Sequence, residues 1–355
     1  MLRTRSVIRI IALVAFSLSL ISLAEAATSP RVFVSATRGK DSNTATLCTV
    51  ANPCYSWKAA LSVVATGGEV VALDNGTYGA ATINKAVTLE GPVGGYTGIN
   101  VSSGDGIDIN APGATVILRG LTIDGANRSG TIGINATSFG ALHIEDCVVN
   151  GFSGNGIFVA GTGDSSGPTL SHLFGPAGSH LFIKDTISRN NGGAGIFTAT
   201  PASVDHVRVE DNAGSGFVVQ NATARVRNSV ASGNQGTDVL NNGTAVGGGF
   251  VAYGTDSSGA PLLNASALLY LDGCVATMNS IGVSVSAYSS FGGTIGAAAS
   301  LSRCSVTNNV VGLGQTANFT GNGNAVTDMA GTNPGTNLID DNQSGNSFPV
   351  QHIIQ

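Results

Sequence analysis

The sequence predicts an all-β solenoid, in which short strands wind into stacked coils. The first observation is a repeat, because seven segments with one pattern recur between residues 116 and 309. Their shortest spacings are about 21 to 26 residues, which is typical of proteins that stack one supersecondary unit on the next. The second is composition: 50 glycines, 42% hydrophobic residues and only 10% charged residues. Apolar coils joined by many turns have such a composition.

Alignment of the seven segments justifies the strands. Residues three and five positions before a reference column are apolar in every copy, and apolar residues with period two are typical of strands. A further strand begins after a glycine, as at Gly156-Ile157 and Gly195-Ile196. The reference column, expected to face the interior, contains Leu121, Cys147, Thr186, Val207, Ser229, Cys274 and Cys304. Five residues later stand asparagines expected to hydrogen-bond from coil to coil, namely Asn191, Asn212, Asn234, Asn279 and Asn309.

Charge and hydrophobicity exclude two classes of protein. Disordered chains combine low hydrophobicity with high charge, and this chain has the reverse. The formal net charge is −5, and an acidic surface repels phosphate, so no nucleic-acid partner is expected.

Residues 1–26 have the pattern of a secretory signal peptide. Arginines precede an apolar run of 14 residues, Ile10 to Leu23, which is too short to span a bilayer. Small residues at Ala24 and Ala26 then mark a cleavage site. We therefore expect a secreted or periplasmic protein, with no membrane span after cleavage.

The sequence resembles the right-handed parallel β-helix proteins of the pectate-lyase-like superfamily, especially secreted bacterial ones without an assigned activity. The resemblance rests on the segment CTVANPCYSWKAALSVVATGGEVVALDNGTYG, Cys48 to Gly79, and on the G-I-x-V units. It implies a single-stranded parallel β-helix, with roughly nine to eleven coils from the length and period. We expect an N-terminal cap at 27–66, the β-helix at 67–320 and a polar tail at 321–355.

The cap is expected to contain a short helix and a disulfide. Residues Tyr55 to Val64 have helix-forming character, and Trp57 is expected to cover the first coil. Cys48 and Cys54 are six residues apart in a polar loop and should pair in an oxidising compartment.

The other three cysteines lie in the reference column. Cys147 is four coils from Cys274 and should be a buried free thiol. Cys274 and Cys304 occupy neighbouring coils, about 4.8 Å apart, so either a bridge or two stacked thiols fits. No histidine clusters with these sulfurs, so no metal site is expected.

Charged residues two positions before the reference column alternate in sign. They should face outward, and we interpret them as a ladder of salt bridges between strands. The residues are Arg119, Glu145, Lys184, Asp205, Arg227 and Asp272.

The sequence contains three candidate catalytic residues, Asp205, His206 and Arg227. Lyases of the superfamily use such residues on a strand face, and the Asp205-His206 pair resembles one of theirs. Yet His206 aligns with Asp146, Asp185 and Asn228 in a turn column, which favours a turn role. Calcium, the cofactor that the resemblance would imply, requires convergent acids, and the sequence shows none.

Three insertions are expected at one turn of the solenoid, at about Gly161–His180, Leu240–Ala267 and Ser286–Ala298. Insertions at one turn project from one face, which is often the binding face. Their aromatic and polar residues are candidates for glycan binding: His172, Phe174, His180, Tyr253, Asp256, Tyr288 and Phe291.

Two functions follow from these observations. The first is non-catalytic binding of a polysaccharide or cell-surface glycan through the inserted loops. The alternative is a divergent polysaccharide lyase or glycoside hydrolase acting on an acidic polysaccharide, which is implied by the resemblance.

Overall fold

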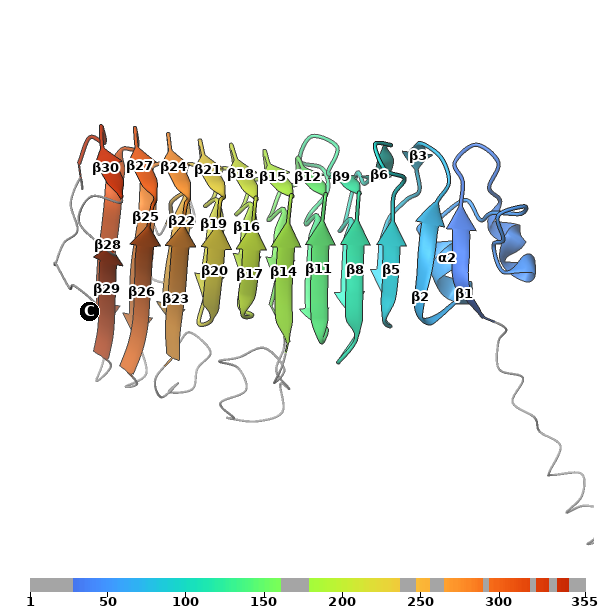
Figure 1. Cartoon of the computed structure of the whole chain (residues 1–355), viewed down its shortest axis with the longest axis horizontal. Helices are drawn as coiled ribbons and strands as arrows, with labels where there is room; N and C mark the ends of the chain where they lie inside the picture. The colour runs from blue at the N-terminus through green and yellow to red at the C-terminus, as the bar shows by residue number, and fades with distance from the viewer. Residues whose placement is uncertain are drawn as a thin grey trace, which may run out of the picture.

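The structure is a computed structural model. It describes residues 28–160, 179–236, 247–255, 265–289, 294–319, 324–331 and 337–344. Within these residues the strands form three parallel sheets, here called A, B and C, with eleven, ten and nine strands. Figure 1 shows the resulting elongated stack, which runs from β1 at one end to β30 at the other. The predicted parallel β-helix and its number of coils are therefore confirmed.

Each coil passes through sheets A, B and C in that order, so strand n pairs with the strand three further along the chain over most of the fold. Sheet A consists of β1 (Ser29–Val34), β2 (Val64–Ala72), β5 (Val87–Glu90), β8 (Thr115–Arg119), β11 (Ala141–Glu145), β14 (His180–Lys184), β17 (Ala202–Asp205), β20 (Thr223–Arg227), β23 (Ala265–Asp272), β26 (Thr294–Ser302) and β29 (Asn324–Gly331). Sheet B consists of β3 (Gly76–Thr77), β6 (Thr97–Asn100), β9 (Thr122–Asp124), β12 (Val148–Asn150), β15 (Ile187–Arg189), β18 (Arg208–Glu210), β21 (Val230–Ser232), β24 (Val275–Thr277), β27 (Ser305–Thr307) and β30 (Leu338–Asp340). Sheet C consists of β4 (Ala81–Ile83), β7 (Ile107–Asn110), β10 (Ile134–Ser138), β13 (Ile157–Val159), β16 (Ile196–Thr198), β19 (Phe217–Gln220), β22 (Phe250–Thr255), β25 (Ile281–Ser289) and β28 (Val311–Phe319).

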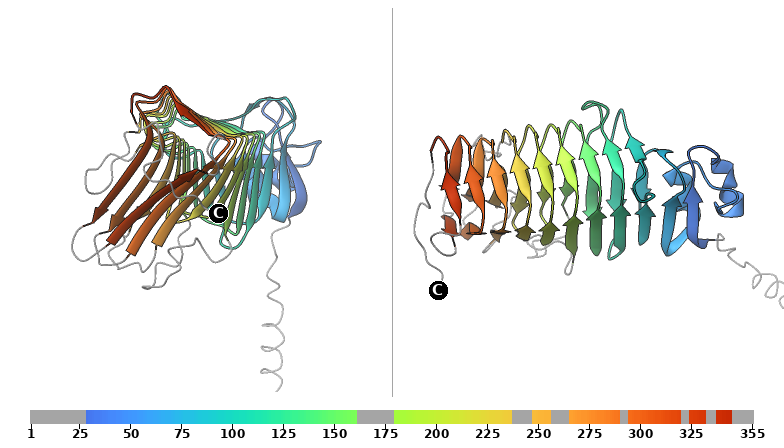
Figure 2. Two further views of the ribbon diagram at one scale, coloured as in Figure 1. Left: turned by 60° about the vertical axis from the view of Figure 1, so that its left-hand side comes forward. Right: turned by 45° about the horizontal axis from the view of Figure 1, so that its top comes forward.

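The interior is built from the columns that the alignment placed inside. Every residue of the reference column is buried, with at most 3% of its surface exposed. Figure 2 shows the three sheets enclosing this interior along the whole stack. Because side chains alternate along a strand, the residues next to the buried ones point outward. The outward columns of sheet A therefore form a surface with a fixed register from coil to coil.

The predicted asparagine ladder is present and fully bonded. Nδ2 of Asn191 donates to Oδ1 of Asn212 over 2.9 Å, and Nδ2 of Asn212 donates to Oδ1 of Asn234 over 2.9 Å. The same bond joins Asn234 to Asn279 and Asn279 to Asn309. The buried amides thereby satisfy donors and acceptors that would otherwise destabilise the interior.

A single left-handed residue turns the chain from sheet A to sheet B. Such a conformation favours glycine, asparagine and aspartate, which explains most of the residues found there. His206 is one of these left-handed turn residues, with φ 52°, so its predicted turn role is confirmed. The column contains Gly120, Asp146, Asp185, His206, Asn228, Gly273 and Arg303.

The N-terminal cap consists of a 3₁₀ helix, η1 (Asp41–Thr46), and an α-helix, α2 (Trp57–Val63). Ser56 caps α2, because its Oγ accepts from the Ala59 amide over 3.1 Å. Trp57 is fully buried, with its ring 5.3 Å from that of Tyr78, so its predicted covering role is confirmed. Neither helix has the length or apolar sequence that a membrane-spanning helix requires.

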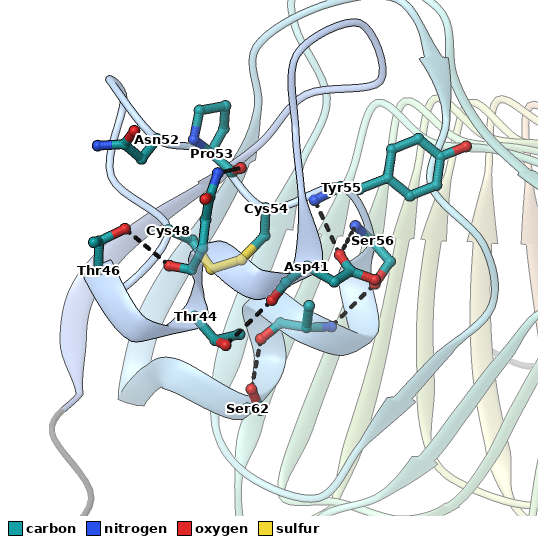
Figure 3. The surroundings of a disulfide bond; sticks show 12 residues. Asp41, Thr44, Thr46, Cys48, Asn52, Pro53, Cys54, Tyr55, Ser56 and Ser62 are labelled. Atoms are coloured by element: carbon teal, nitrogen blue, oxygen red, sulfur yellow. Dashed lines mark hydrogen bonds between the residues drawn. A yellow bond between two sulfur atoms is a disulfide. The ribbon is translucent and has the colours of Figure 1, made fainter.

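A disulfide joins Cys48 to Cys54 beside these helices (Figure 3). Asp41 ties the same loop to the start of α2. Its carboxylate accepts from the backbone amides of Tyr55, over 3.0 Å, and Ser56, over 2.9 Å. Cys147, Cys274 and Cys304 are free and buried.

The limits of the solenoid differ from those expected. Strand β1 lies in the segment assigned to the cap, yet it pairs with β2 as the first strand of sheet A. Strands β29 and β30 lie in the expected polar tail, yet they pair with β26 and β27. The reason is that a β-helix offers an unpaired strand edge at each end, which any extended segment can cover.

Candidate functional site

A groove of about 370 Å³ lies on the outer face of sheet A. Its volume is within the range of known ligand sites. The lining side chains come from four consecutive strands, β11, β14, β17 and β20, so the groove crosses the strands along the axis of the stack. It is lined by His143, Glu145, Phe182, Ile183, Lys184, Ser203, Val204, Asp205, Arg225 and Arg227.

One outward column gives the groove its aromatic side, and we call it the aromatic column. Strand pairing places its members in register on consecutive strands: His143, Phe182, Ser203, Arg225 and Tyr270. The rings of His143 and Phe182 are stacked, with centroids 4.5 Å apart. Phe182 and Tyr270 are large and yet 37% and 41% exposed. Exposed rings in a fixed row can stack against the apolar faces of a bound molecule.

His180 adds a second imidazole beside this column. Its ring centroid is 4.4 Å from that of Phe182, and its Nε2 is 2.9 Å from Oγ of Ser203. Burial lowers the pKa of His180, and electrostatic interactions with His143 and Arg225 lower it further. At neutral pH His180 is therefore a neutral hydrogen-bonding group.

The second outward column, which we call the charged column, is the one predicted to form a salt-bridge ladder. The structure places its alternating signs in register, and Glu90 extends the column by one strand. Arg119 does bridge strands, to Glu145 at 2.9 Å and to Glu90 at 3.8 Å. The column contains Glu90, Arg119, Glu145, Lys184, Asp205, Arg227 and Asp272.

Beyond Glu145 the predicted ladder is wrong. Lys184 pairs with Asp185 of its own turn at 3.4 Å, and Asp272 pairs with Arg303 at 2.5 Å. The left-handed turn column stands next to the charged column and offers nearer partners than the adjacent strand. Among the described residues, Arg227 has no ion pair within 4 Å, although it lines the groove.

The three catalytic candidates are neighbours, but only two line the groove. Asp205 on β17 and Arg227 on β20 are partners in the strand register, although their side chains form no ion pair with each other. His206 is the next residue in the turn, with Nδ1 3.1 Å from Oδ1 of Asp205. Burial raises the pKa of Asp205, but hydrogen bonds from Asn228 and His206 outweigh it, so the net pKa is lowered. Asp205 is thus a stable anion and a weak base.

Of the residues predicted on inserted loops, the structure describes three, and it places them on strands of two different sheets. His180 lies on β14 of sheet A. Tyr253 and Tyr288 lie in β22 and β25 of sheet C, so their placement on loops is wrong. Tyr253 is only 9% exposed and, with Tyr288, belongs to an apolar cluster on the outer side of sheet C. His172, Phe174, Asp256 and Phe291 lie outside the described residues.

Strand length explains this error. The strands of sheet C lengthen along the stack, from three residues in β13 and β16 to six in β22 and nine in β25. Tyr253 and Tyr288, which were expected on insertions, therefore belong to lengthened strands. The alternation of small polar and apolar residues in Ile281–Ser289 was the signal for this, because it has the period of a strand.

The described residues include no group of three or more His, Cys, Asp or Glu side chains arranged as metal ligands. In the groove, Glu145 is bound to Arg119, and Asp205 accepts from Asn228 over 3.0 Å. These acids do not fit a calcium site, which needs several oxygen ligands that converge.

Comparison with known proteins supports the fold. No model of a protein family matches the sequence, and no curated protein matches it. Among solved structures, pectate lyase Pel9A is similar at 15% identity with a TM-score of 0.51, over 88% of this chain and 80% of that one. The A-module of mannuronan C-5 epimerase AlgE4 from Azotobacter vinelandii is 16% identical, with a TM-score of 0.42 over 81% and 91%. A rhamnogalacturonan lyase is 15% identical, with a TM-score of 0.32 over 85% and 67%.

Proposed function

We propose that the protein binds an acidic polysaccharide in the groove of sheet A, without cleaving it. The observation that carries the proposal is Arg227, a cation that lines the groove and has no ion pair among the described residues. A carboxylate of the ligand would supply that partner. Bonds between guanidinium and carboxylate are among the stronger hydrogen bonds in proteins, because both groups are charged.

The aromatic column supports a sugar polymer over a small anion. A polysaccharide presents apolar ring faces together with hydroxyl groups along its length. Phe182 would stack against a ring face, and Ser203 and His180 would exchange hydrogen bonds with hydroxyls. Because the groove crosses four strands, it has the shape for a linear chain lying along the stack.

The chemistry of Asp205, the catalytic candidate that is an acid of the groove, favours binding over cleavage. Elimination requires a base strong enough to remove a carbon-bound proton, whereas the lowered pKa of Asp205 makes it a weak base. Hydrolysis requires a carboxyl group that donates a proton, and Asp205 is ionised at neutral pH for the same reason. Binding needs neither group.

One structural comparison and one expectation from the sequence agree with the proposal. Pectate lyase Pel9A, which shares the fold, is named for action on an acidic polysaccharide. The signal peptide expected at residues 1–26 would export the protein to a compartment where such polymers occur.

The test is calorimetric binding to a panel of acidic and neutral polysaccharides, with parallel measurement of unsaturated uronate absorbance and of new reducing ends. We expect Arg227→Gln and Phe182→Ala each to lower the affinity for the acidic polymers about tenfold, a change of about 1.4 kcal/mol. Arg208→Gln is the matched control, because Arg208 pairs with Glu210 on sheet B, away from the groove. Equal losses of affinity in all three variants would contradict the assignment of the binding site to the groove. Detection of cleavage products would show that the protein is a lyase or a hydrolase, and would contradict the proposal of binding without cleavage.

A further inference from the structure

The charges of the charged column alternate in sign from strand to strand, and the spacing of this alternation determines which acidic polymer matches the groove. Within the groove its members on successive strands are Glu145, Lys184, Asp205 and Arg227. Strands in a sheet are about 4.8 Å apart, so Lys184 and Arg227 are separated by roughly 10 Å, with the Asp205 carboxylate between them. Positive charge therefore recurs at every second strand.

An extended polysaccharide advances by about one strand spacing per sugar unit. A chain that lies along the groove would thus place one unit over each strand. The unit over β14 would meet Lys184, which also contacts the exposed Asp185 of its own turn at 3.4 Å, and the unit over β20 would meet Arg227, which has no ion pair among the described residues. The unit over β17 would meet the carboxylate of Asp205. A ligand carboxylate at that position would be repelled, because like charges at close range are unfavourable.

We infer that the groove selects polysaccharides in which one sugar in two carries a carboxylate, over polymers that carry one on every sugar. This inference rests on the proposed function and deepens it by naming the class of ligand. The uncharged sugar of each pair would lie over Asp205, whose carboxylate can accept hydrogen bonds from sugar hydroxyls.

Asp205 is the residue that carries this selectivity. Glu145, the other anion of the groove, is neutralised by Arg119 at 2.9 Å. Asp205 has no arginine or lysine within 4 Å among the described residues, and it is held by Asn228 and His206 instead. Because Asp205 lines the groove, its carboxylate presents a full negative charge to a ligand at neutral pH.

The aromatic column has the same register and agrees with the inference. Ser203 stands beside Asp205 on β17, whereas Phe182 precedes Lys184 on β14 and Arg225 precedes Arg227 on β20. The two strands that bear a cation thus also bear the larger side chains. The strand between them bears a hydroxyl and a carboxylate, which suit a neutral sugar rich in hydroxyls.

The experiment compares two oligosaccharides of equal length by calorimetry at neutral pH and low salt. The probes are hyaluronan oligosaccharides, with a carboxylate on every second sugar, and oligogalacturonates, with one on every sugar. We expect the wild-type protein to bind the alternating probe about tenfold more tightly. In Asp205→Asn, the affinity for oligogalacturonate should rise about fivefold, because the repulsion is removed, while hyaluronan affinity changes less than about twofold.

Asp340→Asn is the control, since it removes the same charge from an exposed site on β30 of sheet B. Oligogalacturonate binding that equals or exceeds hyaluronan binding in the wild type would overturn the inference but leave the proposed function intact. An equal gain in Asp205→Asn and Asp340→Asn would also overturn it, because net charge alone would then explain the effect. Failure of both probes to bind would contradict the proposed function itself.

Discussion

Arg225 and Tyr270 are directly paired on adjacent strands, and the guanidinium carbon of Arg225 lies 5.2 Å from the centroid of the Tyr270 ring. The ring thus holds an exposed cation in place at the end of the groove. We expect Tyr270→Ala to lower the affinity for an acidic polysaccharide about threefold to tenfold, and Tyr270→Phe to preserve it, because only the ring is needed. Calorimetry checks both variants. A loss in Tyr270→Phe equal to that in Tyr270→Ala would assign the effect to the hydroxyl instead.

His180 should make stability depend on pH. Its pKa is lowered in the folded protein by burial and by electrostatic interactions with His143 and Arg225. The unfolded chain therefore takes up a proton more readily, so the free energy of unfolding falls as pH drops below about 6.5 and levels off below the folded-state pKa. His180→Gln should show a smaller fall in urea midpoint between pH 7 and pH 5. Parallel pH profiles for the two proteins would contradict this role.

The asparagine ladder should be a major source of stability. Asn212 is fully buried and bonds to Asn191, Asn234 and the carbonyl of Ser188. Asn212→Ala leaves these partners unsatisfied, and we expect a loss of about 2–4 kcal/mol in the free energy of unfolding. Asn308→Gly is the control, because Asn308 is exposed and left-handed, with φ 57°. Denaturant unfolding measures the free energy of unfolding of both variants. Similar losses in Asn212→Ala and Asn308→Gly would show that the ladder stabilises the protein no more than an exposed asparagine does.

Substitutions of His206 should change stability according to how well the new residue adopts a left-handed backbone, because we expect the imidazole to have no catalytic or binding role. Its φ of 52° suits asparagine but not a β-branched residue. We expect His206→Asn to change stability by less than about 0.5 kcal/mol, and His206→Val to cost about 1–2 kcal/mol. Glycan affinity should stay unchanged in His206→Asn, because His206 does not line the groove. A large loss of glycan affinity in His206→Asn would show that His206 contributes to the binding site.

Mild oxidation should distinguish the three free thiols. The strand pairs on either side of Cys274 and Cys304 are in register, which stacks the two residues about 4.8 Å apart, inside the range for a disulfide. Cys147 has Leu121 and Thr186 above and below it, and burial raises its pKa to about 12. Peptide mapping after treatment with oxidised glutathione should find Cys274 joined to Cys304 and Cys147 unmodified. Recovery of both thiols intact would show that the interior holds them apart.

The sequence predicts the interior well, because burial leaves a strict pattern. Apolar residues at fixed positions, together with asparagines five residues after the reference column, were sufficient to place the core and its ladder. The same alignment also contained the aromatic column, four residues before the reference column, in His143, Phe182 and Tyr270. The residue types of that column vary, so the sequence does not reveal it, and only the strand register shows that its members form one row.

The rest of the site could not be predicted, for two physical reasons. A charge on a strand can pair with the next strand or with its own turn, and the choice at Lys184 depends on where Asp185 points. An inserted segment can form a loop or lengthen a strand, and Tyr253 lies in a strand because its neighbours in sheet C also lengthen. Both choices depend on contacts between coils, which a single segment does not specify.

The asparagine ladder also gives the stack an electrical direction. In each bond Nδ2 of one residue donates to Oδ1 of the asparagine nearer the C-terminus, from Asn191 through to Asn342. The amide dipoles are therefore aligned head to tail, as peptide dipoles are in an α-helix, with their positive ends toward the last coils. Hydrogen bonds in such a chain polarise one another, so each additional coil strengthens the row that it joins. A coil inserted with its amide reversed would break that polarity and would interrupt the stack even if its strands paired correctly.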